Sequence, residues 1–377
     1  MIIGMGTLQD EFQLSGEYQA FHGWLEKLEK AEIVFKCFSP KGHHLRGFDF
    51  IRVKSGEFIV NKLFEVWEFI HEAQRIENQV DMIHIFLPTP SFLWIADRIK
   101  KKIKKPLFVT CLGEDAQNQG ASWFRQIGRS FVFFSVRFLA PLLMPTAHFS
   151  ADAYIVGNQM VAQQLLRRGC SPDKIRTLWP CLPSEGKPDQ ISQEIALAME
   201  SLPTFLYVGH FLPNKGVEIL VEAFSKLSRA RARLCLVWSG LGDLEKIRSL
   251  VRGFHLESDI SIVERRVHLS TVFSKAAALV VPMTQSFGQV SPPIILIEAF
   301  RSGIPLLVSK FPSTEYIGKE GRSVFFINPF DVDDLRRKMD RVLNETLLMT
   351  TMREKQRSFY AEKMERIDLS QIYGRRI

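Results

Sequence analysis

The sequence predicts an α/β protein made of two doubly wound, Rossmann-like domains, and two observations carry this prediction. Short apolar runs rich in Val, Ile and Phe recur along the chain, separated by helix-period segments. Runs of about four to eight residues bounded by Gly or Pro are typical of a parallel sheet with helices on both faces. The length of 377 residues indicates more than one domain, because single cores stop growing near about 250–300 residues.

The predicted strands follow one another in both halves of the chain. In the first half they are 1–5, 32–38, 48–53, 82–87, 106–112, 153–157 and 175–179. In the second half they are 205–209, 233–240, 259–263, 278–282, 305–309 and 323–327. The apolar residues between them have the spacing of amphipathic helices.

The segment CLPSEGKPDQ (181–190) separates the two predicted domains. It holds two prolines and a glycine without apolar periodicity, which is typical of a linker. We therefore predict an N-terminal domain over 1–188 and a C-terminal domain over 189–350. Residues 351–377 are highly charged and are expected to form terminal helices that cross back to the N-terminal domain.

Composition indicates a cytoplasmic globular protein. Hydrophobic residues make up 46% and charged residues 24%, which are ordinary shares. The five cysteines are odd in number and scattered, as expected of reduced thiols. The start lacks a secretory signal pattern, and prolines interrupt the longest uncharged stretches, so no membrane span is expected. The nine histidines show no metal-ligand spacing, so we expect neither a metal nor a cofactor.

The net charge of +8 is concentrated in one window. Residues 98–137 hold nine basic residues against two acids, and aromatic residues are interleaved with the arginines over 123–139. Cations beside large apolar side chains suit contact with anionic lipid at the inner face of a membrane. A solvated surface is the plainer interpretation, and no motif supports nucleic acid. The residues expected to form this membrane patch are Lys101, Lys102, Lys104, Lys105, Arg125 and Arg129.

The segment GHFLPNKG (209–216) has the pattern of a phosphate-binding loop. Gly209 follows a predicted strand and permits a tight turn. Lys215 immediately precedes a predicted helix, whose N-terminus presents free amides and the positive end of the helix dipole. A surface lysine in a strand-to-helix loop is the alternative interpretation.

The segment 283–305 supplies a second set of nucleotide-binding groups. Backbone amides near Gly288 can approach a phosphate because no side chain intervenes. Glu298 is expected to begin a helical segment that ends at Gly303, and its carboxylate can accept hydrogen bonds from a ribose diol. A helix-start glutamate favoured by the dipole is the alternative. Together the two segments indicate a nucleoside diphosphate site at the carboxyl edge of the second sheet.

These motifs resemble those of the family-four retaining glycosyltransferases of the GT-B fold. VGHFLPNKGVEILVEAF and IEAFRSGIPLLVS are similar to two of that family's C-terminal signatures, and the likeness extends over nearly the whole chain. The resemblance implies two domains facing each other across a cleft, a nucleoside-diphosphate sugar donor, a glycan or lipid-linked acceptor, and metal-independent transfer with retention.

The resemblance also assigns residues to each substrate. Lys215 and Glu298 are the expected catalytic residues, and both also bind the donor. The remaining donor-binding residues are Gly209, His210, Gln285, Gly288 and Gln289. The expected acceptor-side residues are Gly16, Gly113, Glu114 and Asp115.

Three positions depart from the family pattern and leave an alternative open. His210 stands where the family has arginine, Leu112 where it has histidine, and Gln285 where it has glutamate. These changes indicate an altered donor-sugar pocket or lost catalysis. The alternative function is therefore a weakened or inactive subunit that binds nucleotide or partners an active transferase. A sugar-nucleotide epimerase is less favoured because the acid and base it needs are not apparent near Leu112.

Overall fold

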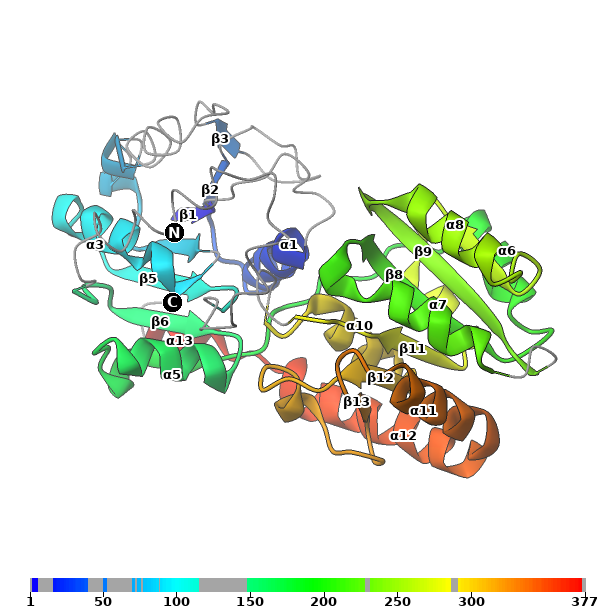
Figure 1. Ribbon diagram of the computed structural model, residues 1–377. Coiled ribbons are helices and arrows are strands. Elements are labelled where there is room, and N and C mark those ends of the chain that lie inside the picture. The colour runs from blue at the N-terminus through cyan, green and yellow to red at the C-terminus, as the bar shows by residue number, and fades with distance from the viewer. Residues whose placement is uncertain are drawn as a thin grey trace. The chain divides into compact units, whose positions relative to one another are not determined.

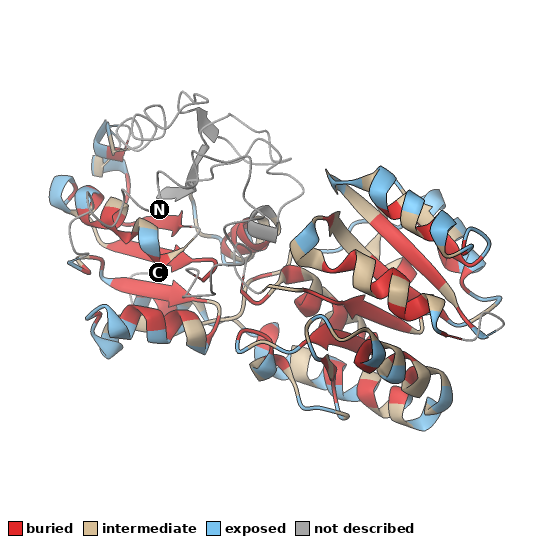
Figure 2. Cartoon of the chain, viewed as in Figure 1, coloured by how far each residue is buried: buried red, intermediate tan, exposed pale blue. Residues whose placement is uncertain are grey.

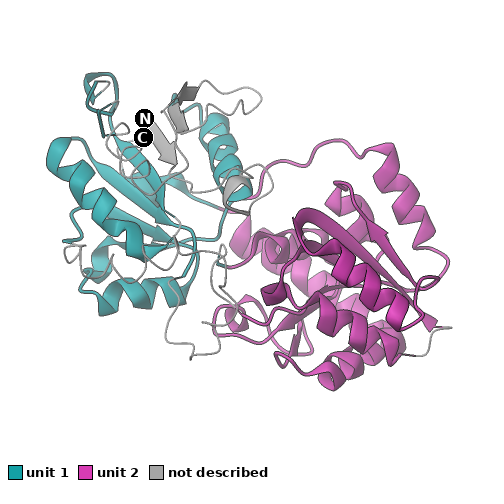
Figure 3. Ribbon diagram, turned by 45° about the horizontal axis from the view of Figure 1, so that its top comes forward, with its two compact units in different colours: residues 1–181, 287–291, 367–377 teal, residues 182–286, 292–366 magenta. Residues whose placement is uncertain are grey.

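The computed structural model describes residues 2–5, 16–39, 50–52, 70–71, 73–75, 77–87, 89–114, 148–227, 231–285 and 291–374. The chain forms two compact units, each built on its own parallel sheet (Figures 1 and 3). Unit 1 comprises Met1–Cys181, Phe287–Ser291 and Ile367–Ile377, and unit 2 comprises Leu182–Ser286 and Pro292–Arg366. The prediction of two doubly wound α/β domains is confirmed, whereas their arrangement across a cleft stays a prediction.

The sheet of unit 1 has seven parallel strands in the order β3-β2-β1-β4-β5-β6-β7. Each overlaps a strand predicted for the first half of the chain, although β2 begins at Lys36 and not at residue 32 as predicted. Their bounds are β1 Ile2–Met5, β2 Lys36–Ser39, β3 Phe50–Arg52, β4 Ile83–Leu87, β5 Leu107–Cys111, β6 Ala153–Val156 and β7 Ile175–Thr177. The strand order reverses between β1 and β4, which therefore flank the topological switch point of this sheet.

Helices cover both faces of the sheet in unit 1. They are α1 Gly16–Lys30, α3 Leu93–Lys102, α5 Gln159–Arg167 and α13 Leu369–Tyr373. Alternate residues of β4 point to opposite faces. Ile83, Ile85 and Leu87 join the buried cluster that contains α3 and α5, whereas His84 and Phe86 contact the aromatic side chains of α1 and α13.

The C-terminal helix α13 is held in unit 1 by a buried polar network. The Tyr373 hydroxyl accepts a hydrogen bond from Trp24 Nε1 at 3.1 Å and lies 2.7 Å from His84 Nδ1. The other ring nitrogen of His84 lies 2.8 Å from Thr110 Oγ1. Burial lowers the pKa of His84 to about 3, so the ring is neutral at pH 7. The chain passes between the units at 181/182, where the expected linker begins, at 286/287 and 291/292 on either side of Phe287–Ser291, and again at 366/367.

The sheet of unit 2 has six parallel strands in the order β10-β9-β8-β11-β12-β13. Each coincides with a strand predicted for the second half. Their bounds are β8 Thr204–Phe211, β9 Arg233–Gly242, β10 Ile260–Val263, β11 Ala278–Val281, β12 Leu306–Ser309 and β13 Phe325–Ile327. The order reverses between β8 and β11, so the loops that leave these two strands flank the switch point of unit 2.

Helices also enclose the sheet of unit 2, and its strands are buried (Figure 2). The helices are α6 Gln190–Ala198, α7 Val217–Ser225, α8 Leu244–Gly253, α9 Leu269–Lys275, α10 Ile294–Ser302, α11 Val332–Asn344 and α12 Thr346–Phe359. One buried cluster joins α7, α8 and α11 to alternate residues of the strands. Helices α6, α9 and α10 contact one another outside that cluster. The loops that follow the strands lie at the carboxyl edge of the sheet.

Candidate functional site

The site in unit 2 begins at an irregularity near the end of β8. The pairing of β8 with β9 shifts register between Gly209 and Phe211, because His210 of β8 stands opposite three residues of β9, Ser239 to Leu241. Gly209 has φ +156°, and a Cβ there would lie 3.0 Å from the Tyr207 hydroxyl oxygen. That hydroxyl donates to the His210 carbonyl at 2.6 Å. The prediction that Gly209 follows the strand is wrong, because β8 continues past it to Phe211.

His210 lies beside the irregular end of β9 and beside a lysine. Its Nδ1 lies 2.6 Å from the Ser239 hydroxyl oxygen, near the end of β9. Burial, and next the positive charge of Lys215, lower the pKa of His210 below its ordinary value. The ring is therefore mostly neutral at pH 7, and the two side chains are close enough to interact electrostatically.

Lys215 ends a short 3-10 turn that is fixed to the neighbouring strand. Gly216 follows it with φ +69°, and a Cβ at this position would lie 1.9 Å from the Pro282 carbonyl oxygen just beyond β11. Thr284 also joins the loops, since its amide donates to the Asn214 carbonyl at 3.0 Å. The two loops at the switch point are thus held together by backbone contacts.

Burial lowers the pKa of the Lys215 ammonium to about 8. The side chain is still mostly protonated at pH 7, but water screens its charge less than at the surface. A desolvated cation at the switch point is suited to bind an anion.

Glu298 comes from the helix that follows β11. Helix α10 begins at Ile294 after Pro293, so Glu298 lies in its second turn. The prediction that Glu298 begins the helix is wrong, because proline with its fixed φ starts it earlier. The predicted end at Gly303 is confirmed, with φ +69° at that residue.

Glu298 is partly buried next to charges of both signs. Burial raises its pKa to about 7; the charge of Arg301 opposes this shift and that of Glu185 adds to it. Arg301 is itself fixed to the segment before α6, because it pairs with Glu185 at 2.9 Å and donates to the Pro183 carbonyl at 2.9 Å. Near pH 7 the Glu298 side chain is therefore present both as the neutral acid and as the carboxylate.

The structure places most of the predicted donor residues around one edge of unit 2. Gly209, His210 and Lys215 lie at the end of β8 and in the loop that follows it. Gln285 lies in the loop after β11, and Glu298 on the helix which that loop leads into. Gly288 and Gln289 lie outside the described residues. Sequence reasoning missed Ser239, although its place before the glycines of SGLGDL (239–244) was a signal.

Unit 1 contains a buried polar cluster among the predicted acceptor-side residues. Glu114 follows β5 and is 6% exposed. Its carboxylate accepts hydrogen bonds from the Ser291 hydroxyl at 2.5 Å and from Asn158 Nδ2 at 3.2 Å. The Ser291 amide donates to the Leu112 carbonyl at 2.8 Å. Burial raises the pKa of Glu114, and these two hydrogen bonds oppose the shift.

The orientation of the Asn158 amide is determined by the helix it caps. Its Oδ1 accepts the Val161 amide at the start of α5 at 2.9 Å, so Nδ2 faces Glu114 and Ser291. Sequence reasoning missed Asn158 and Ser291, and only the N-cap pattern of Asn158 was a local signal. Gly113 precedes Glu114, and Gly16 is the first residue of α1. Asp115 lies outside the described residues.

Part of the predicted membrane patch lies at the end of α3. Lys101, Lys102 and Lys104 are exposed and Lys105 is partly buried. Lys100 differs from them, since its ammonium donates to the Asp152 carboxylate at 2.7 Å and the Lys105 carbonyl at 3.0 Å. Arg125 and Arg129 lie outside the described residues.

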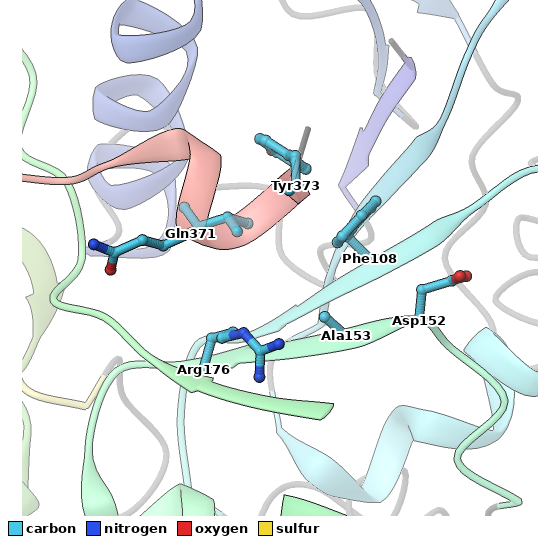
Figure 4. Close-up of a pocket in the computed structure, with 8 residues that line it drawn as sticks. Phe108, Asp152, Ala153, Arg176, Gln371 and Tyr373 are labelled. Carbon is cyan, nitrogen blue, oxygen red and sulfur yellow. The ribbon is translucent and has the colours of Figure 1, made fainter. Parts of the chain in front are cut away.

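A pocket of about 430 Å³ lies elsewhere in unit 1 (Figure 4). It opens between α13 and the first residues of β5, β6 and β7, at the amino-terminal half of these strands. Its lining residues are Phe108, Asp152, Ala153, Arg176, Gln371, Ile372, Tyr373 and Gly374. Glu114 follows the carboxyl end of β5, so this pocket is distinct from the predicted acceptor side.

Candidate metal sites and membrane-spanning helices are absent from the part of the chain that the structure describes. No group of three or more His, Cys, Asp and Glu side chains there could hold a metal ion together. None of the described helices is both long enough and apolar enough to cross a membrane.

A family model covers most of unit 2, including the loops at the switch point. Residues 189–359 match the model described as Glycosyl transferases group 1. The resemblance predicted from the sequence is therefore confirmed over these residues.

Solved structures extend the likeness in fold to the whole chain. Anabaena Alr3699/HepE in complex with UDP-glucose has a TM-score of 0.69 at 13% identity, over 97% of this chain and 95% of that chain. WaaG, a glycosyltransferase involved in lipopolysaccharide biosynthesis, has a TM-score of 0.67 at 17% identity, over 99% and 97%. The chain thus has two parallel-sheet domains like those of GT-B glycosyltransferases.

Curated relatives match a smaller part of the chain. The Arabidopsis thaliana sulfoquinovosyl transferase SQD2 is 24% identical over 211 residues, which are 52% of this chain and 39% of that protein. For the first three curated relatives, the matched stretches span 16%, 49% and 39% of the relative's length. The chain therefore spans less than half of each of these relatives.

Proposed function

We propose that this protein is a glycosyltransferase that moves a sugar from a nucleoside-diphosphate sugar to a glycan or a lipid-linked acceptor, with retention of configuration. The observation that carries the proposal is the pair of loops at the switch point of unit 2. They are held together by Gly216 and Thr284, and they bring the desolvated Lys215 beside His210. These loops lie within the residues that match the glycosyl transferases group 1 model.

In this proposal the donor is bound by groups from both loops and from α10. Lys215 and His210 bind the diphosphate, with the amides at the start of α10 beside them. Glu298 accepts hydrogen bonds from the ribose diol, and Gln285, Gly288 and Gln289 lie along the phosphates and the donor sugar. Charge that develops on the leaving diphosphate is stabilised by the Lys215 ammonium and the backbone amides. These groups supply the positive charge without a metal ion.

The proposed acceptor belongs to cell-surface polysaccharide or glycolipid synthesis. The names of WaaG and of the sulfoquinovosyl transferase support this class. On the acceptor side we place Gly16, Gly113, Glu114 and Asp115. Because Glu114 is buried among Asn158 and Ser291, its role in this proposal is to support the shape of that side.

The same proposal includes contact between α3 and anionic lipid at the cytoplasmic face of a membrane. Lysines near such a surface contribute about 1 kcal/mol each. Changing Lys101, Lys102 and Lys104 together to glutamate is expected to reduce co-sedimentation with anionic vesicles at least tenfold. The matched control changes three exposed lysines of unit 2, Lys187, Lys319 and Lys355, to glutamate. Equal losses in both variants, or equal wild-type binding to neutral vesicles, would exclude a specific patch.

A second candidate function is a subunit that binds nucleotide without transferring sugar. The neutral His210 at a position where the resemblance implies arginine favours it, together with Leu112 and Gln285. Tight nucleotide binding with neither hydrolysis nor transfer of any sugar would support this candidate over the first.

The proposed function is tested by thermal shift with UDP, GDP and ADP and with sugars attached to each. A ligand at 100 times its dissociation constant stabilises the folded state by about 2.7 kcal/mol. One base is expected to raise the unfolding temperature, and the matching nucleoside without phosphates is expected to raise it much less. If no nucleotide shifts the unfolding temperature at millimolar concentration, the proposal fails.

A further inference from the structure

Ser239 and His210 form a contact that the resemblance does not explain. The Ser239 hydroxyl oxygen lies 2.6 Å from His210 Nδ1, and this hydrogen bond joins the irregular end of β9 to β8. The backbone of His210 is held by the Tyr207 hydroxyl, which donates to the His210 carbonyl. Both the backbone and the ring of His210 are therefore fixed.

The end of β9, which carries Ser239, is also held close to the end of β8. Gly242 has φ +95°, and a Cβ there would lie 2.1 Å from the Phe211 carbonyl oxygen. Trp238 Nε1 donates to the Leu241 carbonyl at 2.8 Å and closes the turn around Ser239. The Asp243 amide also donates to the Phe211 carbonyl at 3.2 Å, so the end of β9 is held to the end of β8 and the serine hydroxyl is kept at the imidazole.

A hydrogen bond at one ring nitrogen selects the protonation of the other. When the serine hydroxyl donates to Nδ1, the neutral ring carries its proton on Nε2 and can donate a hydrogen bond there. When Nδ1 donates to the serine, Nε2 has only a lone pair and repels an anion. Only the first arrangement is useful beside a diphosphate.

We infer that Ser239 is a positioning residue that holds His210 as a neutral Nε2–H donor to the diphosphate of the nucleotide, an inference that rests on the proposed function. Lys215 is the charged group that acts on His210 among the residues described around it. One fixed cation and one neutral donor then share the diphosphate. As the pH falls, the ring of His210 takes up a second proton while Nε2–H stays a donor, so binding of the diphosphate tightens at lower pH.

The first experiment measures the tautomer of His210 by ¹⁵N NMR of the unliganded full chain. The wild type is expected to carry the proton on Nε2. Ser239→Thr keeps the hydroxyl and is expected to keep this tautomer, whereas Ser239→Ala is expected to give a mixture. A proton on Nδ1 in the wild type, or no change in Ser239→Ala, would overturn the inference without touching the proposed function.

The second experiment measures the affinity for UDP, GDP or ADP, using the one that stabilises the chain most. Ser239→Ala is expected to weaken binding about tenfold, as for loss of one hydrogen bond to a charged group, and Ser239→Thr to restore it. His210→Arg carries a permanent charge and is expected to bind with a weaker dependence on pH between 5.5 and 7.5.

The outcomes separate the inference from the proposed function. If the wild type binds nucleotide and Ser239→Ala binds it equally well, Ser239 does not position His210. The inference then fails, whereas the proposed function stands. If the wild type has the expected tautomer but binds none of the three nucleotides, both the proposed function and the role of His210 toward the diphosphate fail. Equal pH dependence in the wild type and His210→Arg likewise contradicts the role of the ring.

Discussion

Replacing Lys215 by alanine is expected to lower kcat/KM for sugar transfer by about 10²–10³-fold, because a preorganised cation at the leaving diphosphate is lost. The ammonium is partly desolvated at the switch point, where its charge acts more strongly than in water. Transfer or hydrolysis of the donor identified by the thermal screen measures the effect. Glu298→Ala is expected to abolish turnover as well, through loss of ribose binding.

The control for Lys215→Ala is Lys246→Ala, at a surface lysine of unit 2 that pairs with Glu218 at 3.0 Å. This variant is expected to keep wild-type activity. In the wild type, kcat/KM is expected to fall as the pH rises through about 8, because Lys215 loses its proton. Undiminished activity in both Lys215→Ala and Glu298→Ala would refute the assignment of the donor site.

Replacing Gly216 by alanine is expected to destabilise unit 2 by on the order of 3 kcal/mol or more. The left-handed backbone alone costs about 1–2 kcal/mol for a residue with a Cβ. The added Cβ would also lie 1.9 Å from the Pro282 carbonyl oxygen, so the backbone itself must shift. For a unit of this size, the unfolding temperature is expected to fall by roughly 6–12 °C, measured by calorimetry.

Gly321→Ala separates backbone strain from the close approach. Gly321 has φ +67°, but no atom lies within 4 Å of a Cβ placed there. The free energy of unfolding of this variant is therefore expected to fall only by the cost of the left-handed backbone, about 1–2 kcal/mol. Equal losses in Gly216→Ala and Gly321→Ala would show that the two loops do not approach each other as described.

Local sequence patterns were sufficient for the strands and for the fold class. A buried parallel strand is a short run of apolar residues, and this signal does not depend on distant neighbours. The end of α10 was equally local, because Gly303 at the end of the apolar pattern is a common helix stop. Its start was missed because Glu298 was taken as the helix-start residue, although Pro293 carries the stronger signal.

The irregular pairing of β8 with β9 opposite His210 could not be predicted from the sequence. It depends on the register with β9 and on the Tyr207 hydroxyl reaching the His210 carbonyl. The cluster of Glu114, Asn158 and Ser291 is likewise formed by residues from separate segments of the chain. The spacing of apolar residues along the sequence does not indicate which side chains from distant segments will contact one another.

The sequence by itself determined the strands, their parallel pairing into two sheets and the segments that supply the candidate donor residues. Only the tertiary structure decided the charge states and partners of those residues. Burial moves the pKa of Lys215 to about 8 and that of Glu298 to about 7, and Ser239 reaches His210 across two strands. The physical reason is that strand formation follows from local apolar spacing, whereas desolvation and hydrogen bonding depend on atoms that folding brings together.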